Sequence, residues 1–362
     1  MLHIINQTIN GVENRFREFE NWYGLNKINL DSNVCLLIFN NLRNLSEDVL
    51  LRNLNVKIKK GELKKIILYS ADMDWVAKQD DVDIIVNNLN DIFKENINKI
   101  FLSLTSLSWN RDWKNIATRQ GLGCISMVLD RNIQLNKNTN LIQIEREKHF
   151  CTMQNEPRPI RIYLYDYLIK NNLLDKFEYS FFITQTKDYL NWEDRVGGDD
   201  GLQKLMGEYP KQKSFEEKEN IDRTYDLQIS TLKPELNSYF SIMMETNYMN
   251  GGIYYGFSEK SFKAYCLKKP MMLWASPAAP KGLTELGFKM YDKIFDIELM
   301  SDSSHDIRRI RFFDDIKRIC SLPISQIKNM YIDNLDVIEY NYSNMIKLIE
   351  KEKMDLIELI IK

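Results

Sequence analysis

The stretch "NSYFSIMMET" (residues 237–246), followed by "GGIYYGFSEKSFKAYCLKKPMMLWASP" (251–277), decides the fold. Its first part is a short apolar run typical of a buried strand, and "PMMLWASP" at its end is another. Between them, a glycine-bearing loop leads into a predicted helix with Ser258 as N-cap and Glu259 and Lys260 in the first turn. This order of strand, helix and strand predicts one βαβ unit of a parallel sheet.

The adjacent acid and base at the helix start allow two interpretations. In a βαβ unit, nucleotide phosphates bind at the loop that leaves the carboxyl end of a strand and at the following helix N-terminus. Glu259 and Lys260 occupy that place. Acidic residues are also common in first turns because they complement the helix dipole. An ordinary solvated helix cap is therefore the alternative to a binding site.

The first half of the chain alternates short apolar runs with amphipathic stretches. We predict strands at 33–42, 63–71, 97–106 and 123–129, with helices at 81–96 and 110–122. This spacing is typical of a parallel sheet covered by helices. The first domain, residues 1–150, is therefore predicted to be α/β.

A second α/β domain is expected over residues 151–335. Its predicted elements are a helix at 161–174, a strand at 179–186, an irregular insertion at 187–235, and a helix in "KGLTELGF" that ends with Gly287 at C′. Residues 336–362 are amphipathic and charged, so we expect a terminal helix that packs across the domain junction.

The charge balance of the chain argues against proteins that bind nucleic acid or anionic membranes through their overall charge. The chain has 362 residues, 44% hydrophobic and 28% charged, with 49 Lys and Arg against 51 Asp and Glu. A net charge of −2 gives no global field that would draw the protein to nucleic acid or an anionic membrane. Two local basic groups are expected to be solvated faces, with a nucleic-acid site as the alternative: Lys57, Lys59, Lys60, Lys64 and Lys65, and Arg308, Arg309 and Arg311.

The cysteines, histidines and apolar runs indicate an intracellular setting. The five cysteines form no CxxC pair and are expected to be reduced, mostly buried thiols. The three histidines lie far apart, which argues against a histidine-rich metal site. No run of about 18 apolar residues occurs, so we expect a cytoplasmic protein without a membrane span.

Motifs in the second half carry a family resemblance. "ETN" (245–247) followed by "FSEKSFKAYCLKKPMMLW" (257–274) resembles a motif order found in the fucosyltransferase-like branch of GT-B glycosyltransferases. "LTELGFKMYD" (283–292) and "NEPRPIRIYLYDYLIKNNLLDKFEYSFF" (155–182) are similar to segments of glycosyltransferase-like proteins of phages and large viruses. The resemblance covers residues 150 to about 345. It implies two Rossmann-like domains in the GT-B arrangement, with a cleft between them.

The chemistry of a nucleotide diphosphate sugar gives roles to three residues. The Glu259 carboxylate is suited to accept hydrogen bonds from both ribose hydroxyls. Lys260 can neutralise the departing diphosphate, and Arg161 offers a forked partner for the same oxygens. Fixed positive groups of this kind stabilise a leaving group without a metal. The resemblance implies the same roles for these residues.

Further candidate site residues lie near this pair in the sequence, and the resemblance extends to Glu245 among them. Glu245 is placed with the catalytic candidates, and Glu245 and Asn247 are expected to contact the sugar or order the donor loop. Tyr254 and Tyr255 are candidates to stack on the base, although aromatic residues near a strand end are as often part of the core. Ser258 completes the predicted donor-binding set.

Two carboxylates in the first half of the chain are typical of a different glycosyltransferase fold. "LYSADMDW" (68–75) places Asp72 and Asp74 directly after a predicted strand, as in GT-A glycosyltransferases that bind Mn²⁺ or Mg²⁺. In a GT-B arrangement, Asp72 or Asp74 would instead be an acceptor-side general base. A retaining transferase needs no such base, and the pair then only caps a helix.

The sequence thus predicts a hexosyl- or pentosyltransferase that needs neither cofactor nor metal. Its donor would be a UDP or GDP sugar, and its acceptor a glycan or a hydroxymethylated pyrimidine in viral DNA. Two alternatives stay open. One is a non-catalytic nucleotide-binding or regulatory module of the same fold, and the other is a metal-dependent GT-A transferase that uses Asp72 and Asp74.

Overall fold

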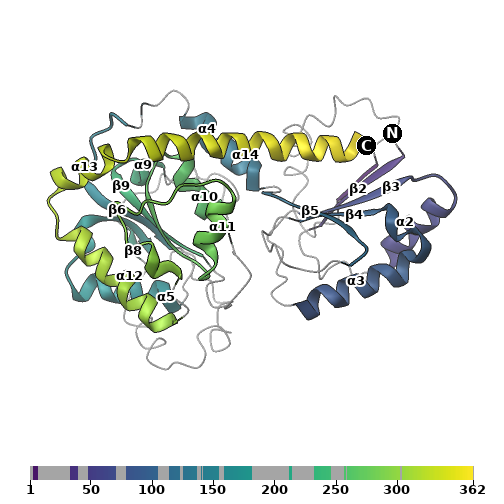
Figure 1. Ribbon diagram of the computed structural model, residues 1–362, viewed down its shortest axis with the longest axis horizontal. Helices are drawn as coiled ribbons and strands as arrows, with labels where there is room; N and C mark the ends of the chain where they lie inside the picture. The colour runs from purple at the N-terminus through teal and green to yellow at the C-terminus, as the bar shows by residue number, and fades with distance from the viewer. Residues whose placement is uncertain are drawn as a thin grey trace. The chain divides into compact units, whose positions relative to one another are not determined.

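The computed structural model divides the chain into two compact units (Figure 1). The first comprises Met1–Arg131, Gly252–Glu259 and Ile346–Lys362, and the second comprises Asn132–Gly251 and Lys260–Met345. The structure describes residues 3–6, 33–39, 48–70, 79–104, 114–122, 125–136, 140, 142–154, 159–181, 212–213, 232–245, 257, 259–301 and 304–361.

The first unit is built on a parallel sheet whose strands follow chain order. Its strands are β1 (His3–Asn6), β2 (Val34–Phe39), β3 (Lys65–Ser70), β4 (Ile100–Leu104) and β5 (Ala117–Gln120), in the order β1-β2-β3-β4-β5. Every adjacent pair is parallel. The described helices that pack on this sheet are α2 (Asp48–Lys59) and α3 (Gln79–Phe93), and α3 runs into the 3₁₀ turn η3 (Lys94–Lys99).

Alternate residues of β2, β3 and β4 form the core of this unit with α2 and α3. On the sheet, the pairs Cys35 and Leu37, Ile66 and Leu68, and Ile100 and Leu102 share one buried face, as the two-residue period of a strand requires. On α2, Leu51, Leu54 and Ile58 repeat at helical spacing and cover that face. The predicted strands at 33–42, 63–71 and 97–106 and the helix at 81–96 are confirmed.

Two predictions near the end of this unit are wrong. The described part of the predicted helix at 110–122 contains β5, an edge strand held by pairing with β4 rather than by its local pattern. The predicted strand at 123–129 is instead the start of helix α4 (Ile125–Asn136). Its buried residues Ser126, Leu129 and Ile133 follow a helical period that a seven-residue window is too short to reveal.

The second unit is built on a sheet whose winding reverses. Its strands are β6 (Lys148–Gln154), β7 (Phe177–Phe181), β8 (Gln212–Lys213), β9 (Ser238–Met244) and β10 (Met271–Trp274), in the order β10-β9-β6-β7-β8. All pairs are parallel except β7 with β8. Phe150 of the central strand pairs in register with Phe177 and Phe240, and the three rings form a row across the core. The α/β class, with a parallel sheet in each unit, is confirmed.

Helices cover this second sheet (Figure 1), and the last of them also supplies its residues from Ile346 onward to the first unit. They are α5 (Pro159–Lys170), α9 (Leu232–Leu236), α10 (Glu259–Cys266), α11 (Ala279–Glu285), α12 (His305–Cys320), α13 (Ile324–Ile332) and α14 (Leu335–Ile361), with 3₁₀ turns η4 (Leu174–Lys176) and η6 (Glu298–Ser301). The helices predicted at 161–174 and within the tail at 336–362 are confirmed. Gly287 has φ +84° just after α11, which confirms the predicted C′ glycine.

The strand order places a topological switch point between β6 and β9. From β6 the chain passes through α5 to β7 on one side. From β9 it passes through α10 to β10 on the other side. In open parallel sheets of this kind, ligands bind outside the carboxyl ends of the two strands where the winding reverses. The described strands of the first sheet follow chain order without such a reversal.

Two predictions about side chains and spans also bear on the fold. Cys35, Cys151, Cys266 and Cys320 are buried free thiols, as expected, and Cys124 lies outside the described residues. Among the helices that the structure describes, none carries an apolar stretch of the length that would cross a bilayer.

Candidate functional site

The carboxyl ends of β6 and β9 form the centre of the candidate site. The two strands are parallel, and the last paired residues are Cys151 and Ser241. Three residues further along, the strands end side by side at Gln154 and Met244. Helix α5 begins a few residues after β6, and α10 begins at Glu259 after β9. The amino ends of both helices therefore follow strands that end at the switch point, where unpaired backbone N–H groups favour an anion.

Arg161 links the two βα units at this edge. It is the third residue of α5, only 3% exposed, and its Nη2 donates to the carbonyl oxygen of Met244 at 2.8 Å. The amide of Glu245 donates to Trp274 of β10, so the preceding Met244 carbonyl faces the β6 side, because alternate residues of a strand face opposite neighbours. Arg161 thus holds the end of β9 at the start of α5.

Glu245 fixes the start of α10. It is 1% exposed, and its carboxylate accepts a hydrogen bond from the Oγ of Ser261, which is itself fully buried in the first turn of α10. Its backbone N–H donates to the carbonyl oxygen of Trp274 at 2.8 Å. One residue therefore connects β9, β10 and the helix that carries the predicted donor-binding pair.

The structure brings together part of the predicted site. Arg161, Glu245 and the first turn of α10 converge at the switch point, and Lys260 is exposed there as the second residue of α10. The predicted helix start at Glu259 is confirmed, and its side chain is not described. The remaining predicted site residues lie outside the described residues: Asp72, Asp74, Asn247, Tyr254, Tyr255 and Ser258.

Sequence reasoning missed a polar side chain on the central strand. Gln154, the last residue of β6, is 2% exposed, and its Nε2 donates to the Oγ1 of Thr152 at 3.0 Å. Thr152 in turn donates to the carbonyl oxygen of Ile242 in β9 at 3.3 Å. Residues 150, 152 and 154 share one face of β6 because side chains alternate along a strand. This two-residue period could have located Gln154, but the sequence analysis did not predict β6 as a strand.

The first turn of α12 adds positive groups near the end of β10. The guanidinium carbon of Arg308 lies 4.5 Å from the ring centroid of Trp274, the last residue of β10, and that of Arg309 lies 4.5 Å from the Tyr163 ring of α5. Burial, and then the charge of Arg308, lower the pKa of His305. The expectation that these arginines form a solvated face is wrong for Arg308, which is 3% exposed because it continues the apolar stripe of α12.

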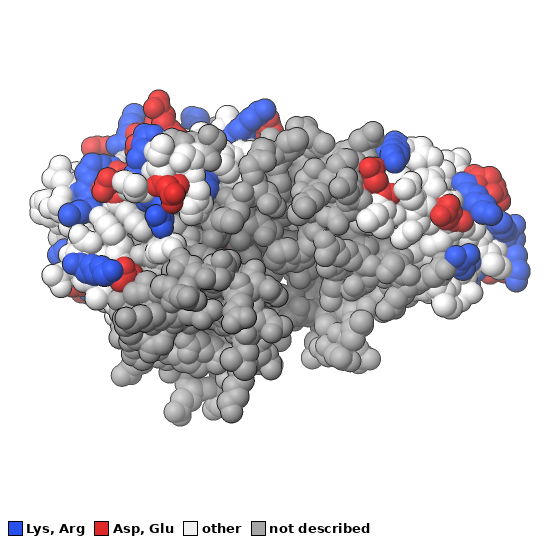
Figure 2. All heavy atoms as spheres, turned by 90° about the horizontal axis from the view of Figure 1, so that it is seen from below, with Lys and Arg blue, Asp and Glu red and all other residues white. Residues whose placement is uncertain are grey.

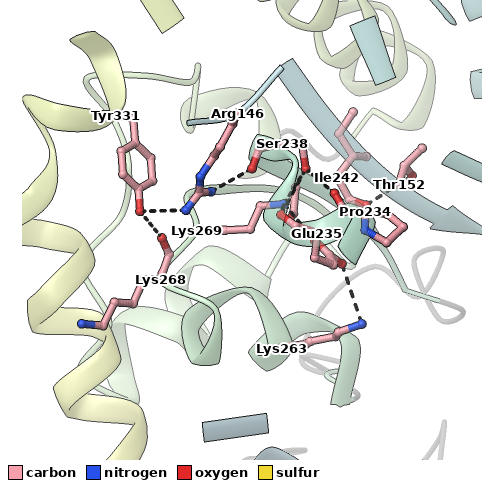
Figure 3. Close-up of polar contacts among 11 residues, drawn as sticks. Arg146, Thr152, Pro234, Glu235, Ser238, Ile242, Lys263, Lys268, Lys269 and Tyr331 are labelled. Atoms are coloured by element: carbon pink, nitrogen blue, oxygen red, sulfur yellow. Dashed lines mark hydrogen bonds and ion pairs between the residues drawn. The ribbon is translucent and has the colours of Figure 1, made fainter. Parts of the chain in front are cut away.

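A second buried charged cluster lies at the amino ends of the same strands (Figure 3). The Nζ of Lys269 contacts the Glu235 carboxylate at 2.8 Å and the Ser238 hydroxyl at 2.7 Å, and Lys263 lies 3.8 Å from the same carboxylate. Burial by itself raises the pKa of Glu235. The charges of Lys269 and Lys263, with hydrogen bonds from Lys269 and Ser241, instead lower it to about 2. Glu235 is therefore a paired carboxylate rather than a proton donor.

Arg146 extends this cluster toward α13. Its Nη1 donates to the carbonyl oxygen of Ser238 at 2.8 Å, and its Nη2 donates to the hydroxyl of Tyr331 at 3.3 Å (Figure 3). Tyr331 passes the connection on by donating to the carbonyl oxygen of Lys268 at 2.8 Å. The cluster ties β9, the start of β10 and α13 together at the edge opposite the switch point, so we interpret it as structural.

The lysine group of the first unit is less available than its sequence indicates. The Nζ of Lys65 donates to the carbonyl oxygen of Leu359 at 2.9 Å, and Lys59 pairs with Glu95 at 3.4 Å. Lys59 is nevertheless exposed, as are Lys57, Lys60 and Lys64, so the expected solvated face is confirmed for all members except the half-buried Lys65. On the face shown in Figure 2, blue and red atoms are interspersed over the described residues. Within those residues no cluster of three or more His, Cys, Asp or Glu side chains is arranged to hold a metal.

Comparison with known proteins gives distant structural matches. No family model and no curated protein sequence matches the chain. A UDP-forming α,α-trehalose-phosphate synthase from Burkholderia xenovorans is similar over 95% of this chain and 77% of its own, with 8% identity and a TM-score of 0.44. The N-terminal domain of Candida albicans trehalose-6-phosphate phosphatase is similar over 98% and 78%, with 8% identity and a TM-score of 0.45.

A third match is an α1,3-fucosyltransferase with GDP-fucose. It is similar over 97% of this chain and 90% of its own, with 14% identity and a TM-score of 0.35. At TM-scores below 0.5, the activity of this chain must be inferred from its own residues.

Proposed function

We propose that this chain is a glycosyltransferase that moves a sugar from a nucleoside diphosphate, UDP or GDP, to a hydroxyl acceptor. The observation that carries the proposal is the position of three residues that sequence motifs had singled out. Arg161 holds the end of β9, Glu245 holds the first turn of α10, and Lys260 is exposed in that turn, which follows the one switch point among the described strands. In parallel sheets this is the position where nucleotides bind.

The chemistry follows from the charges at this edge. As the glycosidic bond breaks, negative charge grows on the departing diphosphate. Lys260 is exposed at the start of α10, and the amino ends of α5 and α10 add partial positive charge. We propose that these groups stabilise the leaving diphosphate without a metal. Arg161, which is hydrogen-bonded to the Met244 carbonyl, would position the donor loop. Glu245, which is hydrogen-bonded to Ser261, would hold α10 in place.

The acceptor is proposed to bind through the first unit. A glycan fits the net charge of −2. A hydroxymethylated pyrimidine in DNA fits the likeness of the motifs to phage and large-virus proteins. Asp72 or Asp74 remains the proposed general base for an inverting reaction.

Binding of the donor is the direct test of this function. Calorimetry with UDP, GDP, UDP-glucose and GDP-fucose should detect binding of one nucleotide series to the purified chain. Lys260→Ala should weaken that binding by about 1.5–3 kcal/mol, the usual loss of a charge-assisted contact. Lys281→Ala is the matched control, because Lys281 is an exposed helical lysine of the same unit, with a side chain 74% exposed. Equal affinity of both variants and the wild type would remove Lys260 from the site.

A non-catalytic nucleotide-binding module is the second candidate function. It is favoured by the burial of Arg161 and Glu245, because the Nη2 of Arg161 donates to the Met244 carbonyl and the Glu245 carboxylate accepts from Ser261. Such a module would bind the nucleotide and leave its sugar intact. Slow hydrolysis of UDP-glucose or GDP-fucose, detected as free sugar that accumulates over hours, supports the transferase. Tight binding without any hydrolysis or transfer supports the module.

A further inference from the structure

Gln154 carries an unpaired acceptor at the switch point. Its side chain is 2% exposed at the end of the central strand, and its Oε1 has no hydrogen-bond partner. Its Nε2 does have a partner, the Oγ1 of Thr152 at 3.0 Å. Nearly all buried polar atoms in proteins are hydrogen-bonded, so this oxygen is an exception that requires an explanation.

The orientation of the amide follows from the next bond along the network. The hydroxyl of Thr152 has one hydrogen, and it donates that hydrogen to the carbonyl oxygen of Ile242, which can only accept. The Oγ1 of Thr152 therefore acts as an acceptor toward Gln154, and an acceptor must face the NH₂ group of the amide. The open atom is thus the carbonyl oxygen Oε1 and not the nitrogen. Whatever satisfies it must donate a hydrogen bond.

The position of this oxygen indicates the class of partner. Gln154 ends β6 beside the end of β9, where Arg161 holds the Met244 carbonyl. Leaving a buried acceptor without a partner destabilises the folded state. A folded protein that retains such a cost at a ligand-binding edge is prepared for a bond that forms on binding. The phosphate oxygens of a nucleotide are acceptors and cannot supply this bond.

We propose that the Oε1 of Gln154 accepts a hydrogen bond from a neutral donor group of the bound nucleotide sugar, a hydroxyl or a ring N–H. This proposal rests on the proposed function and deepens it by naming a residue that recognises the nucleoside or the sugar. Lys260 and the helix amino ends then recognise the diphosphate. In this arrangement the charged groups supply affinity for the diphosphate, and Gln154 supplies selectivity for the nucleoside or the sugar.

The test compares ligands with and without the neutral groups. Gln154→Met keeps the length of the side chain and removes the amide oxygen. We expect it to weaken binding of the nucleotide that the wild type prefers by about tenfold. Binding of inorganic pyrophosphate should be unchanged. The melting temperature should change little, because the variant removes an unpaired buried acceptor as well as the hydrogen bond from the Nε2 of Gln154 to Thr152.

The ligand series also locates the donor group. Loss of affinity for UDP or GDP places it on the nucleoside, whereas loss only for UDP-glucose or GDP-fucose places it on the sugar. Ser180→Ala is the control, since Ser180 is a buried polar residue of neighbouring β7 whose hydroxyl contacts the sulfur of Met153. It should leave the ratio of nucleotide to pyrophosphate affinity unchanged.

Two results would overturn the inference. If Gln154→Met binds the nucleotide as well as the wild type does, or loses pyrophosphate to the same degree, Gln154 does not recognise a neutral donor group. That result leaves the proposed function in place. If the wild type binds no nucleoside diphosphate or nucleotide sugar, the proposed function fails, and the inference fails with it.

Discussion

The Nη2 of Arg161 lies 2.8 Å from the carbonyl oxygen of Met244, and this bond joins the helix that follows β6 to the strand that precedes α10. Arginine is suited to this position because its planar guanidinium stays charged and presents several donors in fixed directions. The bond sets the separation of the two βα units at the switch point. The spacing of the proposed donor site thus depends on a side chain that solvent scarcely reaches.

Arg161→Met should therefore destabilise the fold and weaken nucleotide binding together. The change leaves the buried Met244 carbonyl without its partner, which costs about 1–3 kcal/mol. Urea denaturation measures this free energy of unfolding, and calorimetry measures the affinity. Arg309→Met is the control, because Arg309 is partly exposed and stacks on Tyr163 of the same α5. It should cost less than about 1 kcal/mol. Equal costs in the two variants would contradict the structural role of Arg161.

The Glu235–Lys269 pair predicts a specific response to acid. The folded pKa of Glu235, about 2, lies below its ordinary value of 4.5. The carboxylate therefore stabilises the fold fully above pH 4.5, and this contribution is lost as the pH falls toward 2. The free energy of unfolding, measured by denaturant at fixed steps between pH 5 and pH 2, should fall over that window.

The adjacent lysines give a matched pair of variants for this cluster. Lys269→Met leaves a buried carboxylate without its main partner and should cost about 3–5 kcal/mol. Lys268→Met breaks a partly exposed pair with Glu339 and should cost about 0–1 kcal/mol. If Lys269→Met is as stable as Lys268→Met, the buried pair does not hold the edge of the sheet.

Local pattern predicted the parts of the site that are close in sequence. The start of α10 at Glu259 and the C′ glycine at Gly287 depend on a few neighbouring residues, and both were predicted. Strands with four buried apolar residues in succession, such as β2, β3 and β10, were also predicted. A motif resemblance singled out Arg161 and Glu245, but no local pattern would have placed Arg161 against the carbonyl oxygen of Met244, which is 83 residues away in the sequence.

Features that depend on register or on distant partners were not predictable. β5 is a strand because Phe101 of β4 pairs with Ala117, and its own four residues carry no clear strand pattern. The open oxygen of Gln154 emerges only once β6 lies beside β9. Lys269 and Glu235 are separated by 34 residues, and each by itself looks like an ordinary surface charge.

Metal dependence separates the proposed mechanism from a GT-A mechanism. If Lys260 and the amino ends of α5 and α10 stabilise the leaving diphosphate, transferase or hydrolase turnover should persist in excess EDTA. If Asp72 and Asp74 hold a divalent ion, turnover should collapse in chelator and return with Mn²⁺. Asp72→Asn with Asp74→Asn adds a second measurement, since only a metal mechanism predicts that the double variant loses Mn²⁺ binding in calorimetry.

Salt dependence separates the two classes of acceptor. A DNA acceptor releases counterions on binding, so its affinity should fall by roughly 0.9 log units per log unit of salt for each phosphate neutralised. A neutral glycan has no counterions to release, so its dependence should be shallow. Turnover measured from 50 to 300 mM salt, with hydroxymethylated duplex DNA and with an oligosaccharide acceptor, gives the two slopes.

Charge reversal in the first unit should report on the same choice. Lys60 and Lys64 are exposed, whereas Lys65 bonds to the Leu359 carbonyl and Lys59 pairs with Glu95. The double variant Lys60→Glu, Lys64→Glu should therefore reduce DNA-directed turnover at least tenfold. Its salt dependence should become shallower by the contribution of about two neutralised phosphates. Affinity for UDP or GDP should not change, because the proposed donor site lies in the second sheet. Unchanged turnover on DNA in this variant, together with a shallow slope in the wild type, would leave a glycan as the acceptor.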